Sequence, residues 1–235
     1  MVNQHLDIRA IVLAGGLGTR LRPAIGDLIP KPLAPVNGAP FLDHVLGNLE
    51  FSGIRKVTLS VGHLAFQFVS QYQNGYGNLN VSIESEESPL GTGGAFVRCA
   101  QTTSEPLILV LNGDTLLDYP IDKMLDTLGE KCVGVSLVSI AKEDGRASKV
   151  QLDSEGYLRT FNSRTQSLQG LSYSGVTLIK KDALARVPML RPPFSIEEGV
   201  FEKLAQDGSL AGLVTEQPFI DIGTPDSYRA IRDNR

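Results

Sequence analysis

The sequence predicts an α/β fold with a mainly parallel central sheet. Three observations support this. Short apolar runs alternate with helical patterns through the first half of the chain, as βαβ units do. A glycine-rich loop directly follows the first apolar run. The 235 residues are 42% hydrophobic, enough for one sizeable core, so we expect a single domain over residues 1–235.

In the first half, strands are predicted at residues 8–13, 57–61, 81–84 and 107–111. A crossover helix is predicted between the first two, because Phe41, Leu42, Val45, Leu46 and Leu49 recur at helical spacing and Gly53 follows. A less regular helix is expected after Gly94. Ligands of such sheets bind beyond the carboxyl ends of the strands, where the loop at Gly15 and the turn at 112–114 both fall.

The second half has a different rhythm, with strands predicted at 133–140, 149–153, 157–162 and 173–179. The turn-rich link 153–156 predicts a hairpin. Residues 166–171 are open to interpretation as a mobile loop near the substrate. The sequence shows no internal repeat and no linker long enough to divide the chain.

Composition limits the partners. A net charge of −4 argues against nucleic acid or an anionic membrane as a main partner, because both demand a broad basic surface. Nothing approaches the roughly 20 apolar residues of a membrane span, and the N-terminus lacks the apolar core of a signal peptide, so we expect a cytoplasmic protein. Cys99 and Cys132 lie in apolar segments and are expected to be buried, reduced thiols.

The loop after the first strand has the residues of a phosphate site. Gly15, Gly16 and Gly18 lack a Cβ, so their N–H groups can approach phosphate oxygens closely, and Arg20 adds positive charge. The spacing matches neither G-x-G-x-x-G nor a P-loop, and a lone glycine pair is as well explained by tight packing. Pro30 and Pro32 are expected to hold Lys31 on a stiff, non-helical segment.

These residues, L-A-G-G-L-G-T-R-L followed by P-K-P, resemble the signature of the sugar-1-phosphate nucleotidyltransferases. The segments P-L-G-T-G-G-A at 89–95, L-N-G-D at 111–114 and D-I-G-T-P at 221–225 are similar to further motifs of that family, in the same order. The resemblance covers residues 8–232. It implies a three-layer, Rossmann-like nucleotidyltransferase fold with helices on both faces of the sheet.

The resemblance also implies a reaction in which a nucleoside triphosphate and a sugar 1-phosphate give a nucleotide sugar and pyrophosphate. Arg20 would contact the β- and γ-phosphates of the leaving group, and Lys31 would neutralise charge near the α-phosphate. Arg22 is equally well explained as a surface arginine. The nucleotide-binding set implied is Leu13, Ala14, Gly15, Gly16, Gly18, Thr19, Glu86, Gly91 and Thr92.

Mg²⁺ is the implied cofactor, with Asp114 and Asp221 as ligands. Asp114 taken alone favours an ordinary turn after a strand, because aspartate is common at strand ends. Asp221 lies between apolar residues, where an unpaired charge is costly, and is similar to the family's second metal-coordinating aspartate. The pair therefore favours a metal site over two unrelated turns.

Four residues are predicted on the sugar-phosphate side, namely Asn112, Arg164, Gly175 and Glu197. The family commonly has Phe-x-Glu-Lys where this chain has F-N-S-R, so Arg164 replaces the lysine and the acceptor for the sugar hydroxyls is left open. Glu197 is a candidate substitute. The alternative for this segment is a capping box, with Ser195 as N-cap and Glu198 three residues on.

The acidic segment 84–88 precedes the part of the chain that lines the base in this family. A carboxylate suits the two parallel donors of guanine and repels the acceptor edge of uracil or thymine, so GTP is predicted, read by Glu86 first and Glu87 second. The chain resembles heptose-phosphate guanylyltransferases most. Mannose-1-phosphate guanylyltransferases, uridylyl- or thymidylyltransferases, and an inactive nucleotide-sugar-binding regulator are the alternatives. A homo-oligomer is possible.

Overall fold

The computed structural model describes residues 7–140, 148–162, 170–216 and 219–232. The chain divides into two compact units. Unit 1 comprises Met1–Pro89, Leu111–Asp118 and Phe219–Arg235, and unit 2 comprises Leu90–Val110 and Tyr119–Pro218. The prediction of a single domain stays a prediction.

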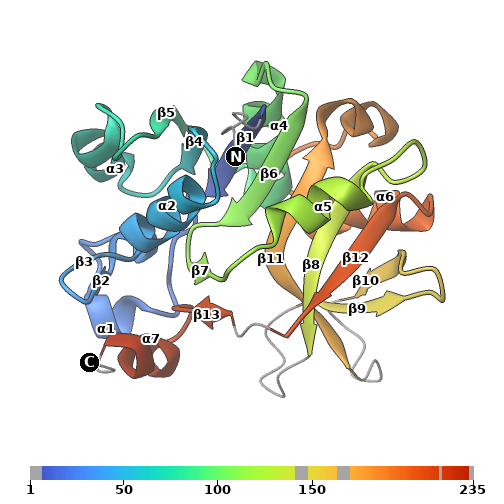
Figure 1. Cartoon of the computed structure of the whole chain (residues 1–235). Helices are drawn as coiled ribbons and strands as arrows, with labels where there is room; N and C mark the ends of the chain where they lie inside the picture. Colours follow the sequence, from blue (N-terminus) through green and yellow to red (C-terminus); the bar gives the residue numbers. More distant parts are fainter. Residues whose placement is uncertain (1–6, 141–147, 163–169, 217–218, 233–235) are drawn as a thin grey trace. The chain divides into compact units, whose positions relative to one another are not determined.

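The sheet of unit 1 is parallel (Figure 1). Its strands are β1 (Ile8–Leu13), β4 (Lys56–Val61) and β5 (Asn80–Ser85), with β4 paired to both neighbours. All three were predicted within a residue of these bounds. They are rich in β-branched and leucine side chains, and the middle strand is buried along five of its six residues, as parallel strands usually are.

The helices of unit 1 are α1 (Arg22–Ile25), α2 (Phe41–Phe51), α3 (Ala65–Tyr72) and α7 (Pro225–Arg232). The predicted apolar stripe of α2 is confirmed, because its buried residues are those with the helical spacing: Phe41, Leu42, Val45, Leu46 and Leu49. The chain leaves α2 through Gly53, whose φ of +84° suits glycine.

Unit 1 also contains two short antiparallel pairs of strands. β2 (Pro35–Val36) pairs with β3 (Ala39–Pro40), and β7 (Thr115–Leu116) pairs with β13 (Ile220–Asp221). In the second pair Asp221 lies opposite Thr115. This pairing brings the C-terminal segment to the end of the Leu111–Asp118 segment.

Unit 2 contains a mixed sheet. β8 (Gly134–Ile140) pairs antiparallel with β11 (Leu171–Lys180) and parallel with β12 (Leu210–Thr215). β9 (Lys149–Leu152) and β10 (Leu158–Asn162) form the predicted hairpin, and β9 also pairs with β11. In this hairpin the carboxylate of Asp153 accepts the amides of Glu155 and Tyr157. β6 (Leu107–Asn112) lies partly in each unit, which are divided after Val110.

The helices of unit 2 are α4 (Gly91–Thr102), α5 (Ile121–Thr127) and α6 (Glu202–Gln206), and a π-helical turn at Glu197–Phe201 leads into α6. A 3₁₀ helix at Lys181–Arg186 also belongs to unit 2. The expected start of α4 after Gly94 is wrong by one turn, because the glycines continue the helix back to Gly91. Cys99 and Cys132 are buried and free, as predicted, and burial raises the pKa of the Cys132 thiol.

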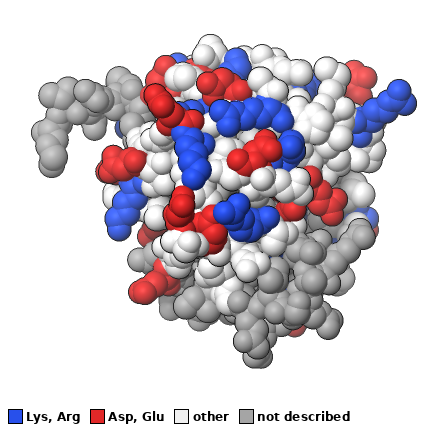
Figure 2. Space-filling view, turned by 90° about the vertical axis from the view of Figure 1, so that its right-hand side faces the viewer, with Lys and Arg blue, Asp and Glu red and all other residues white. Residues whose placement is uncertain are grey.

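Basic and acidic side chains are interspersed on the face of the molecule that Figure 2 shows, without a broad basic area among the described residues there. Within residues 7–140, 148–162, 170–216 and 219–232, every helix is too short or too polar to span a membrane. The predicted lack of nucleic-acid and membrane partners stays a prediction.

Candidate functional site

The glycine loop follows β1 directly. The Leu13 carbonyl accepts the Gly113 amide at 2.9 Å, and the Ala14 amide donates to the Ser60 carbonyl at 2.8 Å. These two bonds anchor the start of the loop to its neighbours in unit 1. Beyond them the chain opens: a Cβ placed on Gly16 would have no atom within 4 Å, and Gly16 is exposed. The loop therefore offers backbone amides that a phosphate can approach.

Gly18 connects the loop to the predicted catalytic lysine. Its φ is +60°, and a Cβ there would lie 3.0 Å from the Cβ of Lys31. Only a glycine combines this backbone conformation with so close a neighbour. The loop and Lys31 are thus brought together, as the predicted site requires.

The arginines of this region differ in their surroundings. Arg20 is exposed, as is Thr19 before it. Arg22 pairs with Asp27 at 3.3 Å, and its guanidinium donates to the Leu17 carbonyl at 3.4 Å. This places Arg22 in a local contact that holds the loop and leaves Arg20 as the better candidate for a phosphate ligand.

Lys31 begins a single 3₁₀ turn, Lys31–Leu33, with Pro30 and Pro32 buried beside it. The expectation of a non-helical segment is therefore wrong, because proline at the first turn of a helix costs no hydrogen bond. The two prolines nevertheless restrict the backbone on both sides of Lys31, as predicted. The Lys31 ammonium forms an ion pair and hydrogen bond with the Asp114 carboxylate, with 11% of the lysine side chain and 29% of the aspartate exposed.

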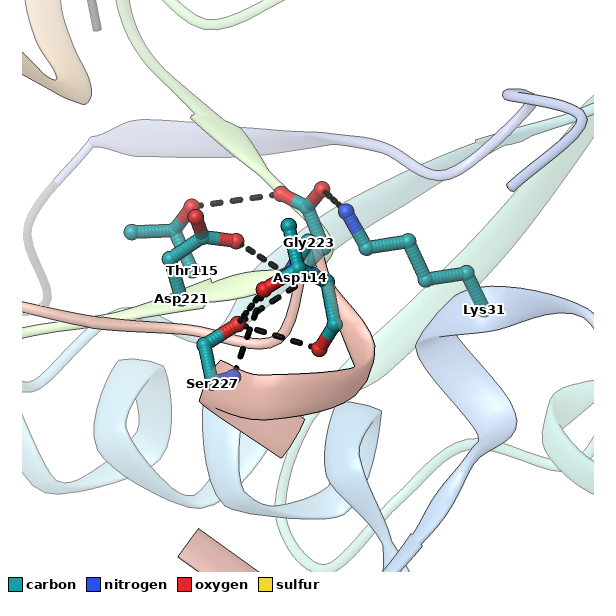
Figure 3. Close-up of polar contacts among 7 residues, drawn as sticks. Lys31, Asp114, Thr115, Asp221, Gly223 and Ser227 are labelled. Atoms are coloured by element: carbon teal, nitrogen blue, oxygen red, sulfur yellow. Dashed lines mark hydrogen bonds and ion pairs between the residues drawn. The ribbon is translucent and has the colours of Figure 1, made fainter. Parts of the chain in front are cut away.

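The two predicted metal ligands lie at the β7–β13 pair (Figure 3). Asp114 precedes β7 and accepts a hydrogen bond from the Thr115 hydroxyl at 3.2 Å, while its backbone carbonyl accepts the Ile222 amide at 3.2 Å. Asp221 ends β13, and its carboxylate accepts the Gly223 amide. The strand register and this backbone bond thus hold Asp114, just before β7, next to Asp221, at the end of β13.

Past Asp221 the chain turns into α7. The turn is closed by reciprocal contacts between Thr224 and Ser227, whose hydroxyls lie 3.0 Å apart. The Ser227 amide also donates to the Thr224 hydroxyl at 3.3 Å. This side-chain cap fixes the C-terminal side of the Asp221 segment.

The described residues contain no group of three or more His, Cys, Asp and Glu side chains arranged to hold a metal ion. Two carboxylates nevertheless fit a magnesium site in which the phosphates of a bound nucleotide supply further ligands. Mg²⁺ is usually held by one or two carboxylates, with waters and substrate phosphates in the other positions. The ion pair of Asp114 with Lys31 is consistent with an electrostatic preference for a cation at this carboxylate.

Of the two glutamates considered for the base, Glu86 lies against the loop. A Cβ on Gly15 would come within 2.9 Å of its carboxylate, and one on Gly62 within 2.6 Å. The Glu86 amide donates to the Val61 carbonyl at 3.0 Å, which sets the side chain at the end of β5. Glu87 is exposed. Gly62 was missed by sequence reasoning, although a glycine directly after the second predicted strand was a usable signal.

In unit 2, the glycines of the L-G-T-G-G sequence at residues 90–94 pack against other residues of the protein. The φ of Gly91 is +70°, and a Cβ there would lie 2.4 Å from the Phe194 carbonyl oxygen. A Cβ on Gly93 would lie 2.2 Å from the Phe194 ring. The hydroxyl of Thr92 accepts the Ile196 amide at 2.9 Å. Sequence reasoning assigned Gly91 and Thr92 to the nucleotide and did not foresee this contact with residues 194–196.

The other sugar-side residues are placed unevenly. Asn112 ends β6 in unit 1. Gly175 has a φ of +81° inside β11, at a break in the register with β8, the kind of bulge that is common beside active sites. Glu197 is half-buried and starts the π turn. Arg164 lies outside the described residues, as do residues 166–169 of the loop considered above.

Comparison of the sequence with known proteins identifies the family of this chain. The model of the nucleotidyl transferase family matches residues 9–234. The chain belongs to this family. A D-glycero-α-D-manno-heptose 1-phosphate guanylyltransferase from Aneurinibacillus thermoaerophilus is 32% identical, over 94% of this chain and 96% of its own length. A mannose-1-phosphate guanylyltransferase from Mycobacterium tuberculosis is 31% identical, and the chain covers 62% of its length.

Among solved structures, HddC from Yersinia pseudotuberculosis superimposes with a TM-score of 0.81 at 27% identity, covering 96% of this chain and 98% of that one. HddC has also been crystallised in complex with GMP-PN. The predicted family and the predicted α/β nucleotidyltransferase fold, with its mainly parallel sheet, are both confirmed. The roles of individual site residues stay predictions.

Proposed function

We propose that this member of the nucleotidyl transferase family transfers GMP from GTP to a sugar 1-phosphate, giving a GDP-sugar and pyrophosphate. D-glycero-α-D-manno-heptose 1-phosphate is the first substrate to test, because the relative named for it matches this chain over nearly the whole length of both. The complex of HddC with GMP-PN supports a guanine nucleotide. The base assignment rests on the position of the Glu86 carboxylate, which lies so close to Gly15 and Gly62 that a Cβ on either glycine would come within 2.9 Å of it.

In the proposed reaction a phosphate oxygen of the sugar 1-phosphate attacks the α-phosphorus of GTP. The bond from that phosphorus to the bridging oxygen breaks, and pyrophosphate leaves with the electron pair. Both reactants are polyanions, so catalysis rests on placed positive charge rather than on an enzyme nucleophile. Lys31 and Arg20 supply that charge. The backbone amides of the glycine loop hold the phosphates, and the neighbouring residues Leu13, Ala14 and Thr19 belong to the same nucleotide-binding segment.

Asp114 and Asp221 are proposed to hold Mg²⁺, which when bound would neutralise phosphate charge and polarise the phosphorus centre. Asp114 directly precedes β7 and Asp221 ends its partner β13, and hydrogen bonds from the Thr115 hydroxyl and the Gly223 amide orient the two carboxylates. Lys31 is near enough to Asp114 to balance its charge in the ligand-free protein. The three side chains lie at one site in unit 1, where two carboxylates face one ammonium, and this excess of negative charge favours a bound cation.

Guanine presents two parallel donors, N1–H and the N2 amino group, which one carboxylate accepts together. Uracil and thymine place an acceptor in that position and would be repelled. Glu86 is held where its carboxylate borders the glycine loop, whereas Glu87 is exposed to solvent. We therefore assign base recognition to Glu86.

On the sugar side we propose that Asn112, Arg164, Gly175 and Glu197 contact the sugar phosphate. The guanidinium of Arg164 suits the phosphate, and the carboxylate of Glu197 suits a sugar hydroxyl. Mannose 1-phosphate is the second candidate substrate, because a relative named for it is 31% identical. A cytoplasmic location and a homo-oligomer stay predictions.

A substrate screen tests the proposal. The purified protein is assayed with each of the four nucleoside triphosphates and with heptose, mannose, glucose and N-acetylated sugar 1-phosphates, and pyrophosphate release is measured. We expect GTP with the heptose 1-phosphate to give the highest kcat/KM. A preference for UTP or dTTP would overturn the base assignment, and mannose as the preferred sugar would replace heptose.

Glu86→Gln sharpens the base assignment. The amide accepts one hydrogen bond instead of two and lacks the charge, so kcat/KM for GTP should fall by about 10- to 100-fold, the range for losing a hydrogen bond to a charged group. Glu87→Gln is the matched control and should leave kcat/KM for GTP unchanged. Equal losses in the two variants would contradict the assignment to Glu86.

A further inference from the structure

Two motif segments of unit 2 are joined by three hydrogen bonds. The Gly93 amide donates to the Phe194 carbonyl at 2.9 Å, and the Phe194 amide donates to the Leu90 carbonyl at 3.2 Å. The Ile196 amide donates to the hydroxyl of Thr92 at 2.9 Å. The start of α4 and the segment before the π turn are therefore held as one local structure.

The ring of Phe194 strengthens this connection. It fills the space beside two glycines, where a Cβ on Gly93 would lie 2.2 Å away and one on Gly199 would lie 2.4 Å away. Gly199 belongs to the π turn that starts at Glu197. The ring thus holds the π turn against α4, and π turns of this kind are frequent at functional sites.

Within this local structure, the Ser195 hydroxyl has two hydrogen-bond partners. It donates to the Glu197 carboxylate at 2.5 Å and accepts the Glu198 amide at 3.5 Å. The first is a short, charge-assisted bond, whereas the second is at the limit of a hydrogen bond. The capping role that the sequence offers for Ser195 is therefore the minor one, and the main partner of the hydroxyl is Glu197.

The π turn that starts at Glu197 packs against the strand that carries Gly175, because the rings of Phe201 and Tyr173 lie 5.6 Å apart between their centroids. Burial of the Tyr173 hydroxyl raises its pKa, and the charge of Glu197 adds to the effect. Tyr173 lies two residues before Gly175 in β11, at the break in register. An ionised carboxylate has about four acceptor sites, of which the Ser195 hydroxyl takes one, so Glu197 has the capacity to accept further hydrogen bonds from hydroxyl groups of a ligand.

We propose that Ser195 is a positioning residue for sugar recognition: it aims the Glu197 carboxylate at a sugar hydroxyl, and Thr92 and Phe194 hold it there. The inference rests on the proposed function, since it concerns the sugar 1-phosphate of that reaction. It gives the P-L-G-T-G-G segment a second task, support of the sugar side, in addition to its expected place beside the nucleotide.

Ser195→Ala tests this. The change removes the hydroxyl that aims Glu197 while leaving the carboxylate in the chain. KM for the sugar 1-phosphate should rise about tenfold, while KM for GTP and kcat at saturating sugar change less than twofold. Ser195→Thr keeps the hydroxyl and should restore KM. Ser52→Ala is the matched control in unit 1, where the hydroxyl donates one bond to the Asn48 carbonyl at 2.9 Å.

Thr92→Val and Thr92→Ser form a second pair. Valine removes the acceptor of the Ile196 amide and should raise KM for the sugar 1-phosphate, whereas serine keeps it. Thermal melts identify any variant whose fold is lost. Either of two results would overturn the inference. The first is an unchanged KM for the sugar 1-phosphate in Ser195→Ala. The second is a rise in KM that is equal for the sugar 1-phosphate and for GTP in Ser195→Ala and that Ser195→Thr does not reverse. Failure of the proposed function is distinct, because the wild type itself would then release no pyrophosphate.

Discussion

Gly16, in the loop after β1, has no atom within 4 Å of the place that a Cβ would take, whereas Gly93, near the start of α4, would put a Cβ 2.2 Å from the ring of Phe194. The first glycine belongs to unit 1 and faces open space. The second belongs to unit 2, and a side chain of the same chain occupies the space beside it. Both stand in glycine-rich segments that the sequence assigns to nucleotide binding.

The difference shows that a glycine-rich segment can serve either a ligand or the fold. An open glycine lets a ligand come close to backbone amides, so its substitution should reduce binding and leave stability unchanged. A packed glycine makes room for a neighbouring side chain, so its substitution should reduce stability first. Charge follows the same division, because Arg20, Lys31 and Asp114 accompany the open loop while an aromatic ring accompanies the packed one.

The largest effect is expected at Asp114, on the open side. Asp114→Asn keeps the shape of the side chain and removes the charge that pairs with Lys31 and would hold the metal. We expect kcat to fall on the order of 100- to 1,000-fold, as when one pre-organised electrostatic group is lost, with little change in Tm. EDTA should abolish wild-type turnover. Asp118→Asn, at an exposed position four residues on, is the control; an unchanged kcat in Asp114→Asn would refute the metal assignment.

Gly16→Ala comes next. The added methyl group meets no protein atom, so Tm should stay within about 1 °C of the wild type, since surface changes away from special features usually cost less than about 0.5 kcal/mol. The methyl group would keep phosphates from the amides, and KM for GTP should rise roughly 10- to 100-fold. Gly47→Ala in α2 also meets open space and should leave KM unchanged. If Gly16→Ala binds GTP normally, the loop does not bind the phosphates.

Gly93→Ala should have an effect of the opposite kind, on stability rather than on catalysis or binding. The methyl group would overlap the Phe194 ring and come within 3.0 Å of the Ser195 carbonyl oxygen, so the free energy of unfolding should fall by about 1–3 kcal/mol. Denaturant unfolding measures this. Gly129→Ala, an exposed position in unit 2 with no atom within 4 Å, should change it little. Equal stability of the two variants would remove the contrast between open and packed glycines.

Much of the fold could be predicted because its elements carry regular local patterns. The buried stripe of α2 and the strands β1, β4 and β5 follow from hydrophobic spacing, which depends on nearby residues only. The start of α4 was misplaced because glycine weakens a helix pattern, whereas here α4 begins at glycines packed against Phe194. That contact joins segments a hundred residues apart and leaves no periodic trace in the sequence.

The candidate site divides in the same way. Lys31, Asp114 and Asp221 were recognisable because each stands in a short motif, and the structure brings Lys31 to Asp114 and β13 to β7. Gly62 was missed, because its importance lies in what it allows Glu86 to do. The hydrogen bond of Ser195 to Glu197 was not predicted, because the sequence fits a capping box at Ser195, and only the hydrogen-bond distances show which contact of the hydroxyl is the shorter.

The contact between Gly18 and Lys31 has a consequence for speed. Gly18 has a left-handed backbone conformation, and a Cβ built on it would lie 3.0 Å from the Cβ of Lys31. The loop is therefore packed directly against the base of the lysine side chain, and this packing fixes the spacing between the loop amides and that side chain. The donors that meet the phosphates are then set in place when the chain folds. Little reorganisation is left for each turnover, which is the condition under which dipoles and charges lower a barrier most effectively.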